Sequence, residues 1–312
     1  MTPFFSVIIP LYNKEKYIEA TLSSVLKQTF TDFEVIIVDD GSSDNSLKIV
    51  SQFNSPKISI IHQKNQGAPL ARNNGIRAAQ SENIALLDAD DHWHPNHLLE
   101  LKKLFETFPD AGLFCNNYEI YYQKDVVRPA NFKFDYQKAC LIVDDFFKAS
   151  ITNCVAWTSA VGFKREKFNS LGGFNATLKT AQDLDLWIKM ALKYDIAFNP
   201  TITMSYIFHA DNSLSKNEYN HIRYDFINHF SEEEKNNPSL KLYLDVNRFA
   251  VALRCKMNNE PDLYEKLKSD IDYKNLNLKQ KLLLSCPTFI LKITKQFHGV
   301  LIKNGLYFSA FK

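Results

Sequence analysis

The chain has 312 residues, of which 45% are hydrophobic and 23% are charged, as is ordinary for a soluble globular protein. Its 37 Lys and Arg residues nearly balance its 35 Asp and Glu residues, and a net charge of +2 gives no whole-chain reason to expect a nucleic-acid partner. No run of about 18 apolar residues predicts a transmembrane helix, and five scattered cysteines without a CxxC pair argue against a zinc site or a disulfide framework, so we expect a reduced, cytoplasmic setting.

Strand and helix patterns alternate over the first 110 or so residues. The apolar N-terminal segment is too short to span a membrane and lacks the basic start and cleavage site of a signal peptide, so we interpret it as a strand. Short apolar runs predict strands over residues 5–10, 34–38, 57–61 and 83–87. Apolar residues at helical spacing predict a helix around 18–26, a helix capped by Ser43, a helix over 67–80 and a helix opening near Pro95. This alternation predicts an α/β fold with a mainly parallel sheet flanked by helices on both faces.

The pattern loosens after residue 110. Residues 111–115, 118–122 and 202–208 are predicted to be separate strands, residues 154–163 form a further apolar stretch, and residues 184–192 have the spacing of an amphipathic helix. Beyond residue 212 the chain becomes rich in Lys, Asn and Leu and mostly helical in pattern. We therefore predict a main α/β domain over 1–212 and a helical C-terminal extension over 213–312.

Acidic residues follow the predicted second strand in the segment VDDGSSD, over residues 38–44. In open α/β sheets, ligands bind beyond the carboxyl ends of the strands, and an acid after the second strand is where nucleotide-binding folds contact ribose or base. Neither GxGxxG nor GxxxxGK[ST] is present, so no glycine loop is available to hold phosphates. Another group must therefore neutralise a pyrophosphate.

A second acidic segment, LDADD, ends the predicted fourth strand. Asp88 and Asp90 are two positions apart, so they point the same way in an extended segment, and Asp91 follows at the turn. Three carboxylates this close need a cation or strong donors, and Mg²⁺ or Mn²⁺ prefers such ligands together with substrate phosphates. The alternative is an acidic turn that caps the next helix.

A third segment, TAQDLDLWIK, places Asp183 and Asp185 at the start of a predicted amphipathic helix. A carboxylate there could accept the proton of an attacking hydroxyl. Alternatively, both acids could simply be favoured by the helix dipole. Trp187, one turn further on, is interpreted as a core aromatic rather than a platform for a sugar.

Five segments in order resemble the family 2 glycosyltransferases of the GT-A fold. They are FSVIIPLYNKEKYIEATLSSVLKQTF, FEVIIVDDGSSDNS, NQGAPLARNNGI, NIALLDADDHWHPNHL and GFKREKFNSLGGFNATLKTAQDLDLWIKMA, and they cover roughly residues 4–210. The resemblance implies a GT-A catalytic domain over 1–212. It also implies an inverting, metal-dependent transfer of a sugar from a nucleotide diphosphate donor, with UDP as the expected nucleotide, to a hydroxyl acceptor.

The resemblance implies a role for each matching residue. The positions matching nucleotide-sugar contacts are Pro10, Tyr12, Asp39, Asp40, Arg72, Asp88 and Asp90. The positions expected to hold a divalent Mg²⁺ or Mn²⁺ ion are Asp90 and Asp91, with His209 as a further ligand used by some relatives. Asp183 matches the general base, although Gln182 stands where family members often carry Glu, and His92 and His94 are expected to be surface or loop residues beside the metal.

The expected partners are a nucleotide-sugar donor and a glycan or lipid-linked glycan acceptor, in bacterial surface polysaccharide or lipopolysaccharide biosynthesis. Two alternatives are a non-catalytic carbohydrate- or partner-binding module on the same fold and a sugar-nucleotide pyrophosphorylase. The second is disfavoured because LYNKEKY stands where pyrophosphorylases carry a Gly- and Arg-rich loop.

The C-terminal tail, over residues 287–312, alternates apolar and aromatic residues with Lys292, Lys295, Lys303 and Lys312. A basic amphipathic tail can lie on the inner face of the cytoplasmic membrane as a peripheral contact. We favour packing on the catalytic domain or on a second subunit, because most amphipathic helices face a core.

Overall fold

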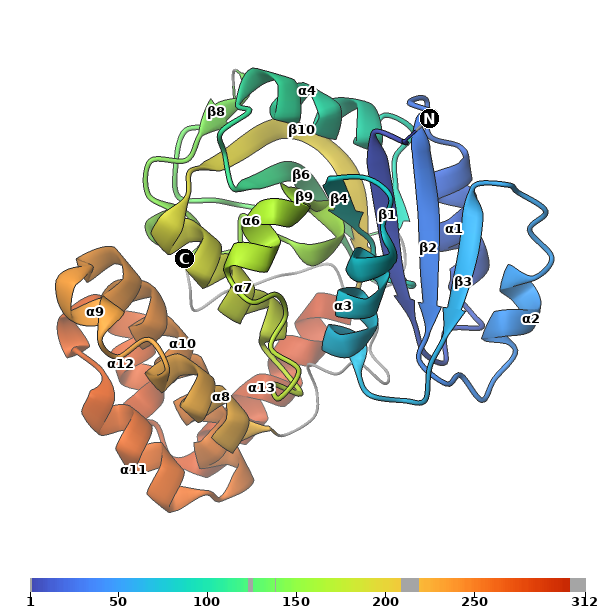
Figure 1. Cartoon of the computed structure of the whole chain (residues 1–312). Coiled ribbons are helices and arrows are strands. Elements are labelled where there is room, and N and C mark those ends of the chain that lie inside the picture. Colours follow the sequence, from blue (N-terminus) through green and yellow to red (C-terminus); the bar gives the residue numbers. More distant parts are fainter. Residues whose placement is uncertain (1, 123–125, 138, 209–218, 304–312) are drawn as a thin grey trace.

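A single twisted sheet, whose strands lie between residues 5 and 207, organises the N-terminal part of the protein, which we call the sheet-bearing part (Figure 1). The computed structural model describes residues 2–122, 126–137, 139–208 and 219–303. Within these residues, ten strands join one sheet whose main path runs β3-β2-β1-β4-β9-β6-β10-β5, with β7 beside β6 and β8 beside β10.

The N-terminal half follows the expected alternation. The elements are β1 (Phe5–Leu11), α1 (Ile18–Leu26), β2 (Phe33–Asp39), α2 (Ser46–Val50), β3 (Ile58–His62), α3 (Ala68–Ala78) and β4 (Asn83–Leu86). The strands β3, β2, β1 and β4 are parallel neighbours, which confirms this part of the prediction. Helix α3 packs closely on the sheet at Gly75, because a glycine has no side chain to hold the two apart. A Cβ added there would lie 2.5 Å from Ile8 Cγ2 and 3.0 Å from Val38 Cγ2.

The second half mixes strand directions. Its elements are β5 (His92–Trp93), α4 (His97–Thr107), β6 (Leu113–Tyr122), β7 (Val126–Pro129), β8 (Leu141–Ile142), α5 (Phe146–Ala149), η1 (Thr158–Ala160), β9 (Val161–Lys164), α6 (Arg165–Ser170), α7 (Gln182–Lys193) and β10 (Ile196–Ile207). Strand β9 runs antiparallel to both β4 and β6, whereas β6 and β10 are parallel. The sheet is therefore parallel in its N-terminal half and mixed as a whole.

Two predicted details are wrong. Residues 111–122 do not form two strands: residues 113–122 are the single strand β6, in which the side-chain amides of Asn116 and Asn117 donate to the carbonyls of His97 and Pro200. Ser43 does not cap α2, which starts at Ser46. Instead, the backbone N–H and the hydroxyl of Ser43 donate to Asn13 Oδ1.

The C-terminal part is helical, as predicted. Its elements are α8 (Asn220–Asn228), α9 (Glu233–Asn236), α10 (Pro238–Asn258), α11 (Pro261–Asp270), η3 (Tyr273–Asn275), α12 (Leu278–Ser285) and α13 (Thr288–Lys303), drawn in orange to red in Figure 1. The long helix α10 joins this group to α5, where Ser239 Oγ donates to Asp145 Oδ2 at 2.6 Å. Among the described residues, no helix combines the length and apolar character needed to cross a membrane.

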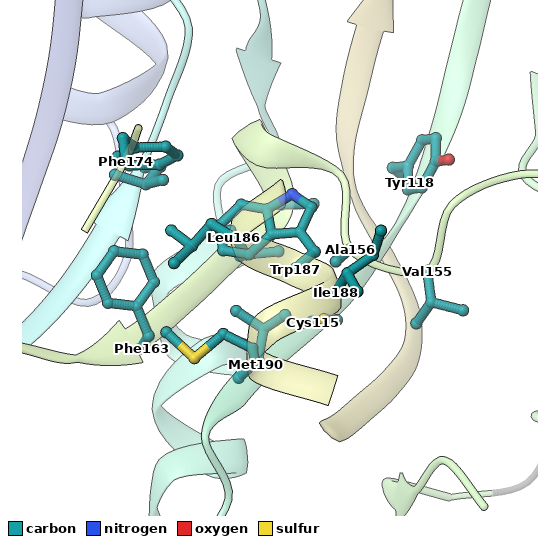
Figure 2. Packing of buried hydrophobic residues seen from close by; sticks show 14 of the residues in the cluster. Cys115, Tyr118, Val155, Ala156, Phe163, Phe174, Leu186, Trp187, Ile188 and Met190 are labelled. Atoms are coloured by element: carbon teal, nitrogen blue, oxygen red, sulfur yellow. The ribbon is translucent and has the colours of Figure 1, made fainter. Parts of the chain in front are cut away.

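The core of the sheet-bearing part surrounds α7 (Figure 2). Trp187 is 1% exposed, and its ring lies 6.1 Å from that of Phe174 and 6.3 Å from that of Phe163. Trp187 is therefore a core residue, as the sequence indicated. All five cysteines are free thiols, which agrees with the expected absence of a disulfide framework.

The buried histidine at the start of α4 makes stability depend on pH. His97 is fully buried, stacks on Trp93 at 4.1 Å and bonds through Nδ1 to Thr203 Oγ1. Burial lowers the pKa of His97 to about 3, well below its ordinary value. The unfolded chain takes up a proton near pH 6.5 that the folded chain resists, so His97 supports the fold above that pH and loses this contribution as pH falls toward 3.

We therefore expect acidification from pH 7 to pH 5 to cost about 2 kcal/mol through this residue, since one pKa unit is worth about 1.4 kcal/mol. Urea unfolding of the wild type and of His97→Gln at both pH values measures this cost, and the variant should lose less stability on acidification. The exposed His221 provides the control variant His221→Gln, which should behave as the wild type does. Equal acid sensitivity of wild type and His97→Gln would contradict the assignment.

Candidate active site at the carboxyl ends of three parallel strands

Three loops meet where β2, β1 and β4 end. Leu11 is paired with Asp39 across β1 and β2, and the carbonyl of Leu11 accepts a hydrogen bond from the N–H of Asp40. Lys14, in the loop after β1, lies with its Nζ 2.5 Å from Asp90 Oδ2, in the loop after β4. The residues singled out after these three strands are therefore brought to one edge of the sheet.

The loop after β1 presents an exposed aromatic ring. Tyr12 is 47% exposed, while Pro10 before it is partly buried in the strand. Asn13 adopts a left-handed backbone with φ of 51°, and its side chain accepts a hydrogen bond from Ser43 in the loop after β2. This anchoring leaves the Tyr12 ring at the surface of the site, where a planar base could stack on it.

Asp39 and Asp40 have different surroundings. Both oxygens of Asp40 are occupied: Oδ1 accepts from Gln63 Nε2 and the Gln66 N–H, and Oδ2 accepts from the Gly67 N–H at 2.8 Å. Asp40 therefore fixes the loop that leads into α3. Asp39 Oδ1 accepts from the Ser42 N–H at 3.1 Å and its Oδ2 lies 3.6 Å from His62 Nδ1, which leaves more of its hydrogen-bonding capacity for a ligand.

Arg72 projects from α3 toward the acidic turn. Its side chain is 6% exposed, its Nη2 lies 2.5 Å from Asp88 Oδ1, and its guanidinium lies 5.5 Å from the centre of the Phe174 ring. The Nε and Nη1 groups are buried and have no hydrogen-bond partner among the described residues. Unpaired buried donors are costly, so these two N–H groups are suited to an anionic ligand.

Asp91 is the most enclosed acid of the turn. It is 3% exposed, its Oδ2 accepts from Ser159 Oγ at 2.5 Å, and its Oδ1 accepts from the Ile207 N–H at 3.2 Å. Burial raises the pKa of Asp91 well above its ordinary value, and the negative charges of Asp90 and Asp88 raise it further. The turn thus concentrates negative charge that a nearby cation would offset.

Residues of η1, which the sequence did not single out, connect the acidic turn to α7. Ser159 bonds Asp91 and also accepts from the Asp88 N–H, while Thr158 Oγ1 donates to Asp183 Oδ2 at 3.3 Å. The preceding Trp157 packs its ring 4.4 Å from that of Tyr206. The available signal was a polar Thr-Ser pair inside the apolar stretch 154–163.

Asp183 and Asp185 separate into two environments at the start of α7. Asp185 is 1% exposed and pairs with Lys189 at 2.6 Å, so its role is structural. Asp183 is partly exposed. Within the described residues, its Oδ1 accepts one hydrogen bond, from the adjacent Leu184 N–H. The chain enters α7 through Ala181 in a left-handed conformation with φ of 60°, a strained geometry that often occurs at functional sites.

The C-terminal helices carry positive charge toward Asp183. Burial, and then the charge of Arg254 on α10, lower the pKa of Arg223 on α8 to about 10, while Asp183 opposes this change. The Arg223 Nε is buried without a hydrogen-bond partner among the described residues. The predicted base therefore lies within electrostatic range of the helical extension.

The acids of the turn fit a divalent cation that draws part of its coordination from a ligand. Within the described residues, no three His, Cys, Asp or Glu side chains surround a common metal position. However, Mg²⁺ is often bound by one or two carboxylates together with substrate phosphates, and Asp88, Asp90 and Asp91 supply such hard oxygens. His209 lies outside the described residues. His92 is an exposed surface residue in β5, and His94 Nε2 bonds Ser205 Oγ at 3.0 Å.

Comparison with known proteins adds several likenesses. The model of the family described as glycosyl transferase family 2 matches residues 6–172. TuaG of Bacillus subtilis, whose name assigns it to teichuronic acid biosynthesis, is 31% identical over 70% of this chain and 83% of its own. WfgD of Escherichia coli, named a UDP-Glc:alpha-D-GlcNAc-diphosphoundecaprenol beta-1,3-glucosyltransferase, is 28% identical over 80% of this chain and 93% of its own.

Other relatives are longer, and solved structures share the fold. The chain spans 43% of the length of an uncharacterized glycosyltransferase of Rickettsia felis, with 28% identity over 83% of this chain. TarS of S. aureus, solved with UDP-GlcNAc, superposes with a TM-score of 0.69 at 18% identity over 99% of this chain and 93% of its own. PcManGT of Pyrobaculum calidifontis, a mannosyltransferase solved with GDP-Man and Mn²⁺, gives a TM-score of 0.57 at 18% identity over 97% of this chain and 81% of its own. These two structures show the GT-A arrangement of sheet and helices.

Proposed function

The chain belongs to glycosyl transferase family 2, and we propose that it transfers a sugar from a nucleoside diphosphate donor to a hydroxyl acceptor, with inversion at the anomeric carbon. We propose a UDP-sugar as the donor, which the UDP-Glc named for WfgD and the UDP-GlcNAc bound to TarS support. We keep the division into a catalytic domain over 1–212 and a helical extension over 213–312 as part of the proposal.

One observation carries the proposal: Arg72 is buried beside the acidic turn with two N–H groups that have no partner in the described residues. The loops that meet there contain no glycine-rich phosphate cradle. The diphosphate of the donor would accept from Arg72 Nε and Nη1, while Asp88 holds the far side of the guanidinium in place.

A divalent Mg²⁺ or Mn²⁺ ion would balance the negative charge of the acidic turn and the donor diphosphate that Arg72 alone does not offset. We propose Asp90 and Asp91 as its protein ligands, with His209 as a further ligand, and the Mn²⁺ in the complex of PcManGT supports this chemistry. Such an ion supplies electrostatic stabilisation of the departing diphosphate. Ser159 positions Asp91 through their 2.5 Å hydrogen bond.

The nucleoside is assigned to the loops after β1 and β2. Tyr12 would stack on the base beside Pro10, and Asp39 would accept a hydrogen bond from the base or ribose. Asp40 is a contact in the family pattern, and its bonds to the 63–67 segment here also make it the residue that positions the entry to α3.

Asp183 is proposed as the general base. The acceptor hydroxyl would give its proton to the Asp183 carboxylate as its oxygen bonds to the anomeric carbon. The bond from that carbon to the donor diphosphate breaks on the opposite face, and the electron pair leaves with the nucleotide. A single displacement of this kind inverts the anomeric configuration. Thr158 would hold the carboxylate in position through Oδ2.

We propose a glycan or lipid-linked glycan as the acceptor, in bacterial surface polysaccharide or lipopolysaccharide biosynthesis, at the cytoplasmic face of the membrane. The names of TuaG and WfgD support this class. The positive charge of Arg223, which interacts electrostatically with Asp183, also favours an acceptor that carries a phosphate. A non-catalytic module would bind the donor without hydrolysing or transferring the sugar, which distinguishes that alternative.

Substitution at Arg72 tests the proposal. Arg72→Met should weaken UDP binding by at least about 100-fold, because a charge-assisted hydrogen bond is worth about 1.5–3 kcal/mol and two are lost. Arg72→Lys retains the charge but not both donors, so its UDP affinity should lie between those of the wild type and Arg72→Met. Calorimetric titration of UDP in the presence of Mn²⁺ measures both.

Arg77 provides the matched control on the same helix. It is exposed and bonds Asn74, so Arg77→Met should bind UDP as the wild type does. If Arg72→Met also kept its UDP affinity, the proposed phosphate contact would be wrong.

A further inference from the structure

The last forty residues differ sharply in charge from the rest of the chain. Residues 273–312 contain seven lysines and no acidic residue, so the preceding 272 residues hold 30 basic residues against all 35 acidic ones. Five of these lysines lie within the part of the tail whose side chains are described: Lys274, Lys279, Lys281, Lys292 and Lys295. The tail is therefore a cationic region on an otherwise slightly acidic protein.

The same region exposes large apolar side chains. Leu278 and Leu282 on α12 are 73% and 62% exposed, and Phe289, Ile293 and Phe297 on α13 are 64%, 61% and 62% exposed. We call these five residues the apolar tail face. Elsewhere in the described residues, the most exposed large hydrophobic side chain is that of Tyr12, at 47%.

The exposed apolar side chains belong to two helices, α12 and α13, whose opposite sides are packed. Phe289, Ile293 and Phe297 are spaced by four residues, so they line one face of α13, and Leu278 and Leu282 are related in the same way on α12. Leu284 and Leu291 are 2% and 4% exposed, which fixes both helices to the helical group (Figure 1). Lys279 and Lys281 lie beside the apolar residues around α12, and Lys292 lies beside those of α13, whereas Lys295 lies toward the opposite side of α13.

We propose that the apolar tail face is a peripheral docking surface for an anionic phospholipid bilayer. The apolar side chains would enter the boundary between headgroups and acyl chains, and the surrounding lysines would contact anionic headgroups. A second copy of this chain fits less well, because a symmetric contact through this face would place lysines against lysines. This proposal adds to the sequence-based preference for packing on the catalytic domain or on a second subunit, because one side of each helix is packed and the other is exposed.

Docking would bring the protein to the membrane that carries the acceptor if the acceptor is lipid-linked. That consequence rests on the proposed function, whereas vesicle binding does not, because it needs neither donor nor transfer. Measuring UDP binding alongside vesicle binding therefore separates failure of the docking surface from failure of the proposed activity.

The test is flotation of the full chain with vesicles of phosphatidylcholine alone and of phosphatidylcholine with phosphatidylglycerol. We expect binding to the anionic vesicles, reduced by salt. The triple variant Phe289→Ser, Ile293→Ser, Phe297→Ser should partition at least about tenfold less, because each side chain loses apolar burial in the bilayer. Lys279→Gln combined with Lys292→Gln should reduce binding by about fivefold for each lysine.

A matched control removes three exposed apolar side chains from the sheet-bearing part: Leu99→Ser, Val127→Ser and Leu192→Ser. This variant should float as the wild type does, and all variants should keep the wild-type thermal shift with UDP and Mn²⁺, which shows that they fold. Absence of wild-type flotation, or equal flotation of wild type and the tail variant, would overturn the proposal. So would a dimer in light scattering that the tail variant converts to a monomer without lipid.

Discussion

Replacing Asp183 with asparagine is expected to lower sugar transfer by about 10²- to 10⁴-fold, the range typical for loss of a general base. Asparagine keeps the size of the side chain and can still accept from Thr158, but it cannot take up the proton of the acceptor hydroxyl. Binding of UDP with Mn²⁺ should stay within about twofold, because the proposed base would contact the acceptor rather than the diphosphate. Transfer rates at saturating donor, together with calorimetric titration of UDP, measure the two effects separately.

The neighbouring acid supplies the matched control. Asp185 lies two positions further along α7, is buried and pairs with Lys189. Asp185→Asn should lower stability modestly and leave the transfer rate per folded molecule close to that of the wild type. Wild-type turnover in Asp183→Asn, or equal losses in the two variants, would remove Asp183 from the mechanism.

The second large effect is expected at Asp90. Asp90→Asn should lower kcat/KM by about 10²- to 10³-fold, because a divalent ion contributes several kcal/mol of charge stabilisation and would lose a carboxylate ligand. The thermal shift that Mn²⁺ adds to UDP binding should largely disappear as well. Lys14 lies 2.5 Å from Asp90 Oδ2, so its ammonium would have to move aside as the ion binds.

An acid remote from the site provides the comparison for Asp90. Asp110 is exposed in the turn after α4, and Asp110→Asn should retain both the activity and the metal-dependent thermal shift. Activity of Asp90→Asn that stays at the wild-type level across a titration of Mn²⁺ would exclude Asp90 as a ligand.

The parallel half of the fold could be predicted because its information is local. Buried parallel strands appear as continuous apolar runs, and their carboxyl ends meet at one edge, so the acids after β2 and β4 were expected to lie together. The structure brings Asp39, Asp90 and Arg72 to that edge. Their roles remain proposals.

Other features depended on contacts between residues distant in sequence. Asn116 and Asn117 break an apolar pattern, yet they continue β6, where their side-chain amides donate to the carbonyls of His97 and Pro200. Ser159 is 68 positions from Asp91, and no local pattern marks a serine that bonds an acid so far away. The exposed side of α13 was also not evident, because a helical pattern gives the same apolar stripe to a packed helix and to a membrane-facing one.

The central claim is that a divalent cation at the end of β4 and Arg72 together offset the charge of a donor diphosphate. The most direct measurement is water-proton relaxation of Mn²⁺ titrated with the protein, with and without UDP. We predict weak enhancement for Mn²⁺ and protein alone, strong enhancement once UDP is added, and loss of that increase in Asp90→Asn and Arg72→Met. An enhancement that UDP does not change, or that both variants retain in full, would contradict the account.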